Sequence, residues 1–244
     1  MSDLKGKTVL ITGGARGLGR EIALALAGAG AQVAFTYFYS VDESDATSTD
    51  LQRLCAKYRA IRCDIRSQNS VSRAVEAALD TFGHIDILIN NAGIFETAQF
   101  EEITEEQWDN VFAVNVRGPF LMSQKCAAAL RQSAGRIINL GSLGGEKPWA
   151  THAHYCCSKA AVHMMTRVMA KALAPEVAVN CVAPGMIDSG QGEPSATFLQ
   201  KLAAKTPLGR NGKPQDVLSA VMYFASAPHF ITGQILTVDG GLGL

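Results

Sequence analysis

The sequence has no excess of charge of either sign, because 22 lysines and arginines balance 22 aspartates and glutamates. A nucleic-acid surface normally carries a basic excess, so nucleic acid is not expected as a partner. No stretch approaches the roughly 18 consecutive apolar residues of a membrane-spanning helix, and the polar segment Met1–Lys7 lacks an apolar signal sequence. We therefore expect a soluble, cytoplasmic protein with no membrane partner.

The cysteines also lack the patterns that bind metals or form redox pairs. No two of them form a CxxC pair, and none has metal-ligand spacing. We interpret them as small core residues or idle thiols in a reducing compartment, and we expect no metal site. The six are Cys55, Cys63, Cys126, Cys156, Cys157 and Cys181.

Short apolar strands alternate with helical patterns along all 244 residues. This alternation predicts an α/β fold, a Rossmann-like doubly wound sheet of seven parallel strands with helices on both faces, formed by a single domain over residues 1–244. The predicted strands are Thr8–Thr12, Gln32–Tyr37, Ala60–Cys63, Ile85–Asn90, Arg136–Leu140, Ala178–Ala183 and Gln234–Val238. The predicted helices are Leu18–Ala29, Asp42–Tyr58, Ser67–Phe82, Thr104–Leu130, Thr151–Leu173 and Pro214–Ala225, with Met186–Arg210 irregular.

A glycine-rich turn, Thr12–Gly19, joins the first strand to the first helix. Gly13, Gly17 and Gly19 allow the backbone to approach a pyrophosphate at the helix N-terminus, which predicts a dinucleotide site. The spacing is G-x3-G-x-G rather than the commoner G-x-G-x-x-G. No carboxylate follows the second strand until Asp42, and Arg16 in the turn is suited to a 2′-phosphate, so NADP(H) is favoured over NAD(H).

Tyr155 and Lys159 lie four residues apart at the start of the Thr151–Leu173 helix, so both side chains share one helix face. A tyrosine has a pKa of about 10, and a neighbouring ammonium is expected to lower that pKa. The pair therefore predicts a proton donor and acceptor for a carbonyl or hydroxyl group.

With these motifs the chain resembles the short-chain dehydrogenase/reductase family in its compact single-domain form, with likeness to 3-oxoacyl reductases. The resemblance covers essentially the whole chain. It rests on the glycine turn, on Tyr155 and Lys159, and on further motifs in the family's order: Asp64, Asn90-Asn91-Ala92-Gly93, Asn115, Ser142 and Pro184-Gly185.

The resemblance implies a role for each matching residue. Asn115, Ser142, Tyr155 and Lys159 would form the catalytic set, with Ser142 bonding the substrate oxygen and Lys159 also binding the nicotinamide ribose. Asp64 would accept a hydrogen bond from the adenine amine beside Ile65. The remaining cofactor residues would be Gly13, Arg16, Gly17, Leu18, Gly19, Asn91, Ala92, Gly93, Pro184, Gly185, Ile187 and Ser189.

Pro119 lies four residues after Asn115 inside a predicted helix. A proline removes the hydrogen bond to the carbonyl four residues earlier, so we expect a kink that frees the Asn115 carbonyl. The family pattern suggests that this carbonyl holds a water in a proton relay to Lys159. A plainer interpretation is that Asn115 bonds neighbouring backbone.

Residues around the catalytic helix suggest a pocket and a subunit contact. Surface or cap positions are favoured for His152 and His154, and Trp149 borders the pocket or packs in the core. Cys156 and Cys157 are expected to be buried. Apolar residues surround most of the helix from Tyr155, which favours a homo-oligomer, a tetramer in the family's usual form, over burial by its own chain.

The sequence therefore predicts an enzyme that transfers a hydride between NADP(H), or NAD(H), and a carbonyl or secondary alcohol. A 3-oxoacyl thioester is one candidate substrate, because Arg131 and Lys171 partly match the basic residues that bind an acidic carrier protein in the family. A non-catalytic NAD(P)-binding regulator is the alternative, although it would not need the acid–base pair. A longer sugar-nucleotide epimerase is disfavoured by the glycine spacing and by the lack of a C-terminal substrate domain.

Overall fold

The computed structural model describes residues 4–188 and 195–244. Its centre is one sheet of seven parallel strands in the order β3-β2-β1-β4-β5-β6-β7, which confirms the predicted doubly wound fold. The strands are β1 (Thr8–Ile11), β2 (Gln32–Tyr37), β3 (Tyr58–Arg62), β4 (Ile87–Asn90), β5 (Arg136–Leu140), β6 (Ala178–Pro184) and β7 (Ile235–Val238).

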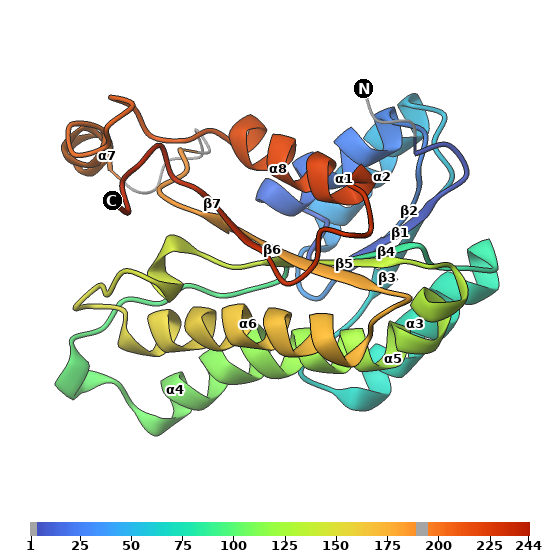
Figure 1. Cartoon of the computed structure of the whole chain (residues 1–244), viewed down its shortest axis with the longest axis horizontal. Coiled ribbons are helices and arrows are strands. Elements are labelled where there is room, and N and C mark those ends of the chain that lie inside the picture. The colour runs from blue at the N-terminus through green and yellow to red at the C-terminus, as the bar shows by residue number, and fades with distance from the viewer. Residues whose placement is uncertain (1–3, 189–194) are drawn as a thin grey trace.

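Helices cover both faces of the sheet (Figure 1). The helices α1 (Gly17–Gly28), α2 (Val41–Arg53) and α8 (Pro214–Ser226) lie on one face, and α3 (Gln68–Phe82), α4 (Glu105–Phe112), α5 (Gly118–Gln132) and α6 (Ala153–Ala172) lie on the other. Every residue of β1 and β4 is buried, because parallel strands in this position need an apolar layer on each side. Two apolar clusters fill these layers, one around Phe35 and one around Leu88.

Two predicted segments differ from the structure by more than a residue or two at their ends. The predicted helix Asp42–Tyr58 ends at Arg53, since Cys55 adopts a φ of 54° that an α-helix cannot continue through, and β3 then begins at Tyr58. The predicted irregular segment Met186–Arg210 contains a helix, α7 (Ala196–Ala203), which Ser195 caps by accepting a hydrogen bond from Phe198 N.

The predicted long helix Thr104–Leu130 is interrupted at Asn115. A π-helical turn, η2 (Ala113–Arg117), separates α4 from α5, and Pro119 lies in the first turn of α5. The break agrees with the kink expected from Pro119, since a proline has no N–H to donate to Asn115. It brings Asn115 into the interior, where 1% of its surface is exposed.

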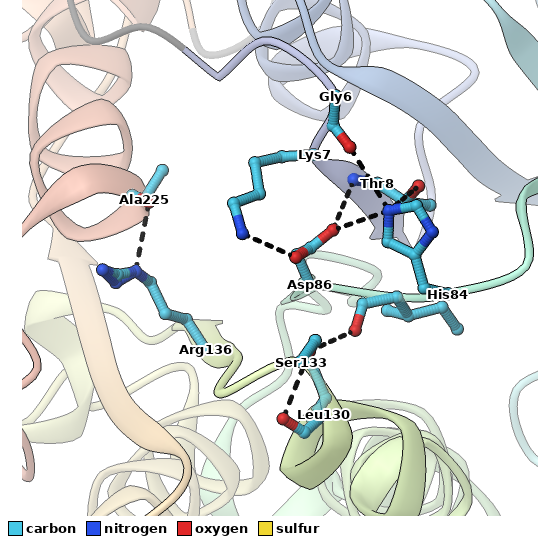
Figure 2. Close-up of polar contacts among 10 residues, drawn as sticks. Gly6, Lys7, Thr8, His84, Asp86, Leu130, Ser133, Arg136 and Ala225 are labelled. Atoms are coloured by element: carbon cyan, nitrogen blue, oxygen red, sulfur yellow. Dashed lines mark hydrogen bonds and ion pairs between the residues drawn. The ribbon is translucent and has the colours of Figure 1, made fainter.

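The amino ends of the strands are closed by a polar cluster (Figure 2). The carboxylate of Asp86 accepts hydrogen bonds from Lys7 Nζ and from Thr8 N, each at 2.8 Å, and His84 Nε2 lies 3.2 Å from Oδ2. A buried carboxylate is stable when its oxygens are paired in this way. This edge of the sheet is therefore braced by satisfied polar contacts.

Candidate active site

The carboxyl ends of β1, β4, β5 and β6 meet at the opposite edge of the sheet from Asp86. The chain runs from β1 outward to β3 and then returns to β4 on the other side of β1. Such a reversal leaves a crevice at the carboxyl ends of the strands, where doubly wound proteins bind ligands.

The glycine turn lies in this crevice, and its glycines stand where a side chain would be strained or would clash. Gly13 and Gly17 have φ values of +66° and +54°, and a Cβ on Gly19 would lie 2.1 Å from the carbonyl oxygen of Gly13. Asn91 braces the turn by donating to Thr12 O at 2.9 Å and to Gly13 O at 3.0 Å. Ala92 N bonds the Thr12 hydroxyl at 3.0 Å.

This turn fits the pyrophosphate of a dinucleotide. The helix α1 starts at Gly17, and its N-cap residue Arg16 makes no side-chain cap, so the first N–H groups point outward from the helix end. Leu18 faces the crevice. The arrangement fits the nicotinamide cofactor that the glycine spacing predicts.

The predicted adenine contact, Asp64, is already paired with its neighbour. Its carboxylate accepts bonds from Arg66 Nε and Nη2, both at 2.9 Å, and this side-chain pairing lowers the pKa of Asp64. Ile65 is buried and packs against Gly118, where a Cβ would lie 2.6 Å from its Cδ1. Arg66 also lies 5.7 Å from the ring centre of Phe38.

Tyr155, Lys159 and Ser142 come together at the head of α6. The ammonium of Lys159 lies 5.7 Å from the centre of the Tyr155 ring and donates to Leu140 O at 2.8 Å. Ser142 Oγ accepts a hydrogen bond from Gly144 N at 3.0 Å, and the Ser142 hydroxyl acts to lower the pKa of the Tyr155 phenol. The predicted pair and its serine therefore lie in one site.

Burial determines the proton affinities in this site. It raises the pKa of Tyr155 above the usual 10, although the Ser142 hydroxyl acts in the opposite direction. Burial also lowers the pKa of Lys159 to about 8. The expectation that Lys159 brings the tyrosine pKa down is therefore wrong for the protein without cofactor, because desolvation of the phenol dominates and the ammonium turns to the Leu140 carbonyl.

Asn115 connects the loop after β4 to α6. Its Oδ1 accepts from Ile94 N at 2.8 Å, and its Nδ2 donates to Ile94 O and to Ser158 Oγ, both at 3.0 Å. Ser158 Oγ in turn donates to Tyr155 O at 2.7 Å. The side chain thus bonds neighbouring backbone, as the plainer interpretation states, while a relay through the main-chain carbonyl stays a prediction.

A cleft of about 990 Å³ opens in front of these side chains. Of the predicted cofactor residues, Leu18, Asn91, Gly93, Pro184 and Gly185 line it together with Ser142, Tyr155 and Lys159. Ile187 instead forms a bridge with Gly212 and packs against the core around Phe35. Ser189 lies outside the described residues.

Two residues that line the cleft, Phe95 and Thr97, were not predicted from the sequence. Both follow β4, and a position directly after the end of a strand is the signal that could have identified them. Trp149 lines the cleft, which is one of the two positions expected for it, and His152 lines the cleft from the N-cap position of α6, in agreement with the expected cap position. His154 is fully buried and Cys157 is exposed, both contrary to expectation.

Comparisons with known proteins agree with this geometry. A family model described as enoyl-(acyl carrier protein) reductase matches residues 13–243. A short-chain dehydrogenase/reductase of Serratia marcescens has a solved structure that superposes with a TM-score of 0.94 at 37% identity, covering 99% of this chain and 100% of that one.

The chain belongs to the short-chain dehydrogenase/reductase family. It is an NAD(P)-dependent oxidoreductase that acts on carbonyl or alcohol groups. A short-chain relative from Staphylococcus epidermidis, named 3-oxoacyl-[acyl-carrier-protein] reductase, is 35% identical over 97% of this chain and 98% of its own. A blue fluorescent protein from a metagenomic library, solved with NADPH, is 34% identical with a TM-score of 0.92, covering 99% of this chain and 100% of that one.

These short-chain relatives give no support to the alternative of a non-catalytic regulator. Among residues 4–188 and 195–244, no helix has the length and apolar character needed to cross a bilayer.

Proposed function

We propose that the chain, acting as a single domain, reduces a ketone to a secondary alcohol with NADPH, and that Tyr155 is the proton donor. The observation that carries the proposal is the placement of Tyr155 in the cleft, together with Ser142 and one helical turn from Lys159. The dinucleotide turn lies at the same edge of the sheet, so a hydride donor and a proton donor would meet on one substrate.

The bound nicotinamide supplies a hydride to the carbonyl carbon. Tyr155 donates its phenol proton to the carbonyl oxygen, and the raised pKa of Tyr155 keeps that proton in place at neutral pH. The Ser142 hydroxyl, held by Gly144 N, stabilises the negative charge that develops on the same oxygen and on the phenolate.

Lys159 stabilises the phenolate left after proton transfer while its ammonium remains charged. Its pKa of about 8 keeps most of the population charged at pH 7. Asn115 holds the helix head in register through Ser158, whose hydroxyl bonds the Tyr155 carbonyl. The side chains of Lys159 and Asn115 both reach Gly93, where a Cβ would be 3.2 Å from Asn115 Oδ1 and 3.7 Å from Lys159 Nζ.

The preference for NADPH over NADH is supported by charge near the end of β2. The segment Thr36–Ser40 carries no carboxylate that would bind a ribose diol or repel a phosphate. Arg16 is exposed in the glycine turn, and the guanidinium groups of Arg62 and Arg66 lie 6.0 and 5.7 Å from the Phe38 ring centre. Arg16 and Arg62 would attract a 2′-phosphate, whereas Arg66 is already paired with Asp64.

A homotetramer in the cytoplasm is the assembly that we propose. Apolar side chains on the outer face of α5 and α6 are exposed, with Phe120 at 46% and both Met164 and Val168 at 56%. A hollow of about 1390 Å³ is lined by Phe120 together with residues of α4 and η2. A surface of this kind is typical of subunit contacts, and light scattering on Val168→Lys against the native protein measures it directly.

A 3-oxoacyl thioester on an acidic carrier protein is a second candidate substrate, supported by the relative from Staphylococcus epidermidis. The contacts of Arg131 weaken the argument from basic residues that would bind an acidic carrier protein. Arg131 donates to Ala172 O at 3.2 Å and lies 3.8 Å from a carboxylate oxygen of Glu176, so its charge is partly used within the chain.

Transfer of a labelled hydride tests the proposal. The native protein is incubated with a panel of ketones and thioesters and with NADPH or NADH deuterated at nicotinamide C4, and the alcohols are analysed by mass spectrometry. We expect one deuterium on the carbinol carbon, with faster transfer from NADPH. Absence of labelled alcohol across the panel, with both cofactors bound tightly, would contradict the proposal.

A further inference from the structure

Three rings form a wall of the cleft next to Tyr155. Phe95 stacks on His152 with ring centres 4.4 Å apart at 24°, and it meets Tyr155 edge-to-face at 4.8 Å and 86°. Trp149 lies 5.8 Å from His152 and runs nearly parallel to Tyr155, at 6.2 Å and 12°. We call Phe95, Trp149 and His152 the aromatic wall; it holds one of the two tryptophans of the chain.

The wall is held rigidly by two threonines. The ring nitrogens of His152 lie 2.9 Å from the hydroxyls of Thr97 and Thr151, one nitrogen to each. The main chain is tied at the same place, since Ala98 N donates to Thr151 O at 3.0 Å. The loop after β4 is thereby fixed to the start of α6, and Phe95 with it.

The cleft around the wall carries almost no charge. Among the described residues that line it, Lys159 is the one lysine or arginine, and its ammonium faces the Leu140 carbonyl. No carboxylate lines the described part. Burial lowers the pKa of His152, with a further contribution from nearby His154, so the His152 ring stays neutral at neutral pH.

Apolar surface inside the cleft is left uncovered. Phe95 is 55% exposed, and Phe198 of α7, which also lines the cleft, is 46% exposed. Met186 and Leu202 line the cleft as well. A ligand that covers these rings gains both burial and ring–ring contact, while an anionic ligand would lose hydration with no free cation to pair with in the described lining.

We propose that the aromatic wall selects neutral ketones that carry a flat aromatic ring one or two bonds from the carbonyl carbon. This inference rests on the proposed function and names its substrate class. The wall contacts Tyr155 directly, so a carbonyl oxygen at the phenol places the adjoining ring against Phe95 and Trp149. The chemical step is unchanged: the hydride adds to the carbonyl carbon and the proton comes from Tyr155.

A matched pair of ketones isolates the effect of the ring. 1-Phenylpropan-2-one and 1-cyclohexylpropan-2-one share the same carbon skeleton and an unconjugated carbonyl, and they differ in the flatness and π-electrons of the ring. With saturating NADPH we expect kcat/KM to be about fivefold higher for the phenyl ketone, within the range of ring–ring contacts. A carboxylate in the para position of the phenyl ring should lower kcat/KM about tenfold.

Leucine variants assign the preference to the wall. Phe95→Leu keeps an apolar side chain but removes the ring, so the phenyl-to-cyclohexyl ratio of kcat/KM should fall to about one. Trp149→Leu should lower the ratio in the same direction. Phe230→Leu is the matched control, because Phe230 is fully exposed and does not line the cleft, and it should keep the native ratio.

The outcomes separate this inference from the proposed function. Equal kcat/KM values for the two ketones in the native protein, or a ratio that survives in both wall variants, would overturn the ring preference while leaving the reductase in place. Faster reduction of a 3-oxobutanoyl thioester of N-acetylcysteamine than of the phenyl ketone would also overturn it. Failure to transfer labelled hydride to any carbonyl would instead remove the proposed function, and this inference with it.

Discussion

Asp86 at the amino edge of the sheet and Lys159 at the carboxyl edge both bury a charged group, with 6% and 7% of their surfaces exposed. Asp86 is paired with the ammonium of Lys7 and the N–H of Thr8, and His84 lies beside it. Lys159 donates to one backbone carbonyl, and burial lowers its pKa to about 8. The Asp86 charge is therefore paired in a way that stabilises the fold, whereas the incompletely paired Lys159 charge is of the kind found at functional sites, as the proposed function requires.

Removing the Lys159 charge should have the largest effect. Lys159→Met is expected to lower kcat for ketone reduction about a hundredfold or more, because the phenolate of Tyr155 loses its stabilising cation. The free energy of unfolding at pH 7 should not decrease, since an incompletely paired buried ammonium is replaced by an apolar side chain. Steady-state kinetics and urea unfolding of the two proteins measure both quantities.

A lower free energy of unfolding in Lys159→Met, together with an unchanged kcat, would contradict this difference between the two residues. Lys159 would then stabilise the fold as Asp86 does.

The pH dependence of the free energy of unfolding tests whether burial destabilises the Lys159 ammonium. The pKa of Lys159 is about 8 in the folded protein and about 10.5 when unfolded, so the folded state binds fewer protons between these values. The free energy of unfolding of the native protein should therefore rise relative to Lys159→Met from pH 8 to 10.5, by about 3 kcal/mol. Urea unfolding of both cofactor-free proteins at pH 7, 8, 9 and 10 tests this.

The native protein's free energy of unfolding, relative to that of Lys159→Met, could instead stay constant or fall as the pH rises. That result would show that burial does not destabilise the Lys159 ammonium.

Asp86→Ala should have a smaller effect, confined to stability. It leaves the N–H of Thr8 and the ammonium of Lys7 without their acceptor, which costs about 2 kcal/mol of unfolding free energy. We expect kcat to change less than twofold, because Asp86 lies at the edge of the sheet opposite the cleft. Asp45→Ala, at an exposed carboxylate, is the matched control for stability.

A large loss of kcat in folded Asp86→Ala, at unchanged cofactor affinity, would contradict the claim that Asp86 contributes to stability and not to catalysis.

The sequence predicted the parts of the site that depend on local pattern. The alternation of short apolar segments with helical patterns predicted the seven strands along the chain. The Gly13–Gly19 turn was predictable because close backbone approach requires glycine at fixed positions. The placement of Tyr155 and Lys159 on one face followed from their helical spacing. Pro119 predicted the break at Asn115 through its missing N–H.

Features that depend on burial or on distant neighbours were not predictable in this way. The raised pKa of Tyr155 comes from desolvation by the surrounding fold, which no spacing reveals. His154 shows the same limit: its ring is fully buried with no hydrogen-bond partner among the described residues, and the nearest carboxylate, of Glu96, lies 4.0 Å away. Phe95 meets His152 through tertiary packing alone.

Replacing Tyr155 with phenylalanine tests the central claim most directly, because it removes the proton donor and keeps the ring that packs against Phe95. For Tyr155→Phe we predict a fall in kcat of about a thousandfold, with the dissociation constant for NADPH within about threefold of the native value, measured by nicotinamide absorbance and fluorescence. Turnover close to the native rate would contradict the account, since the proton would then have to come from another group.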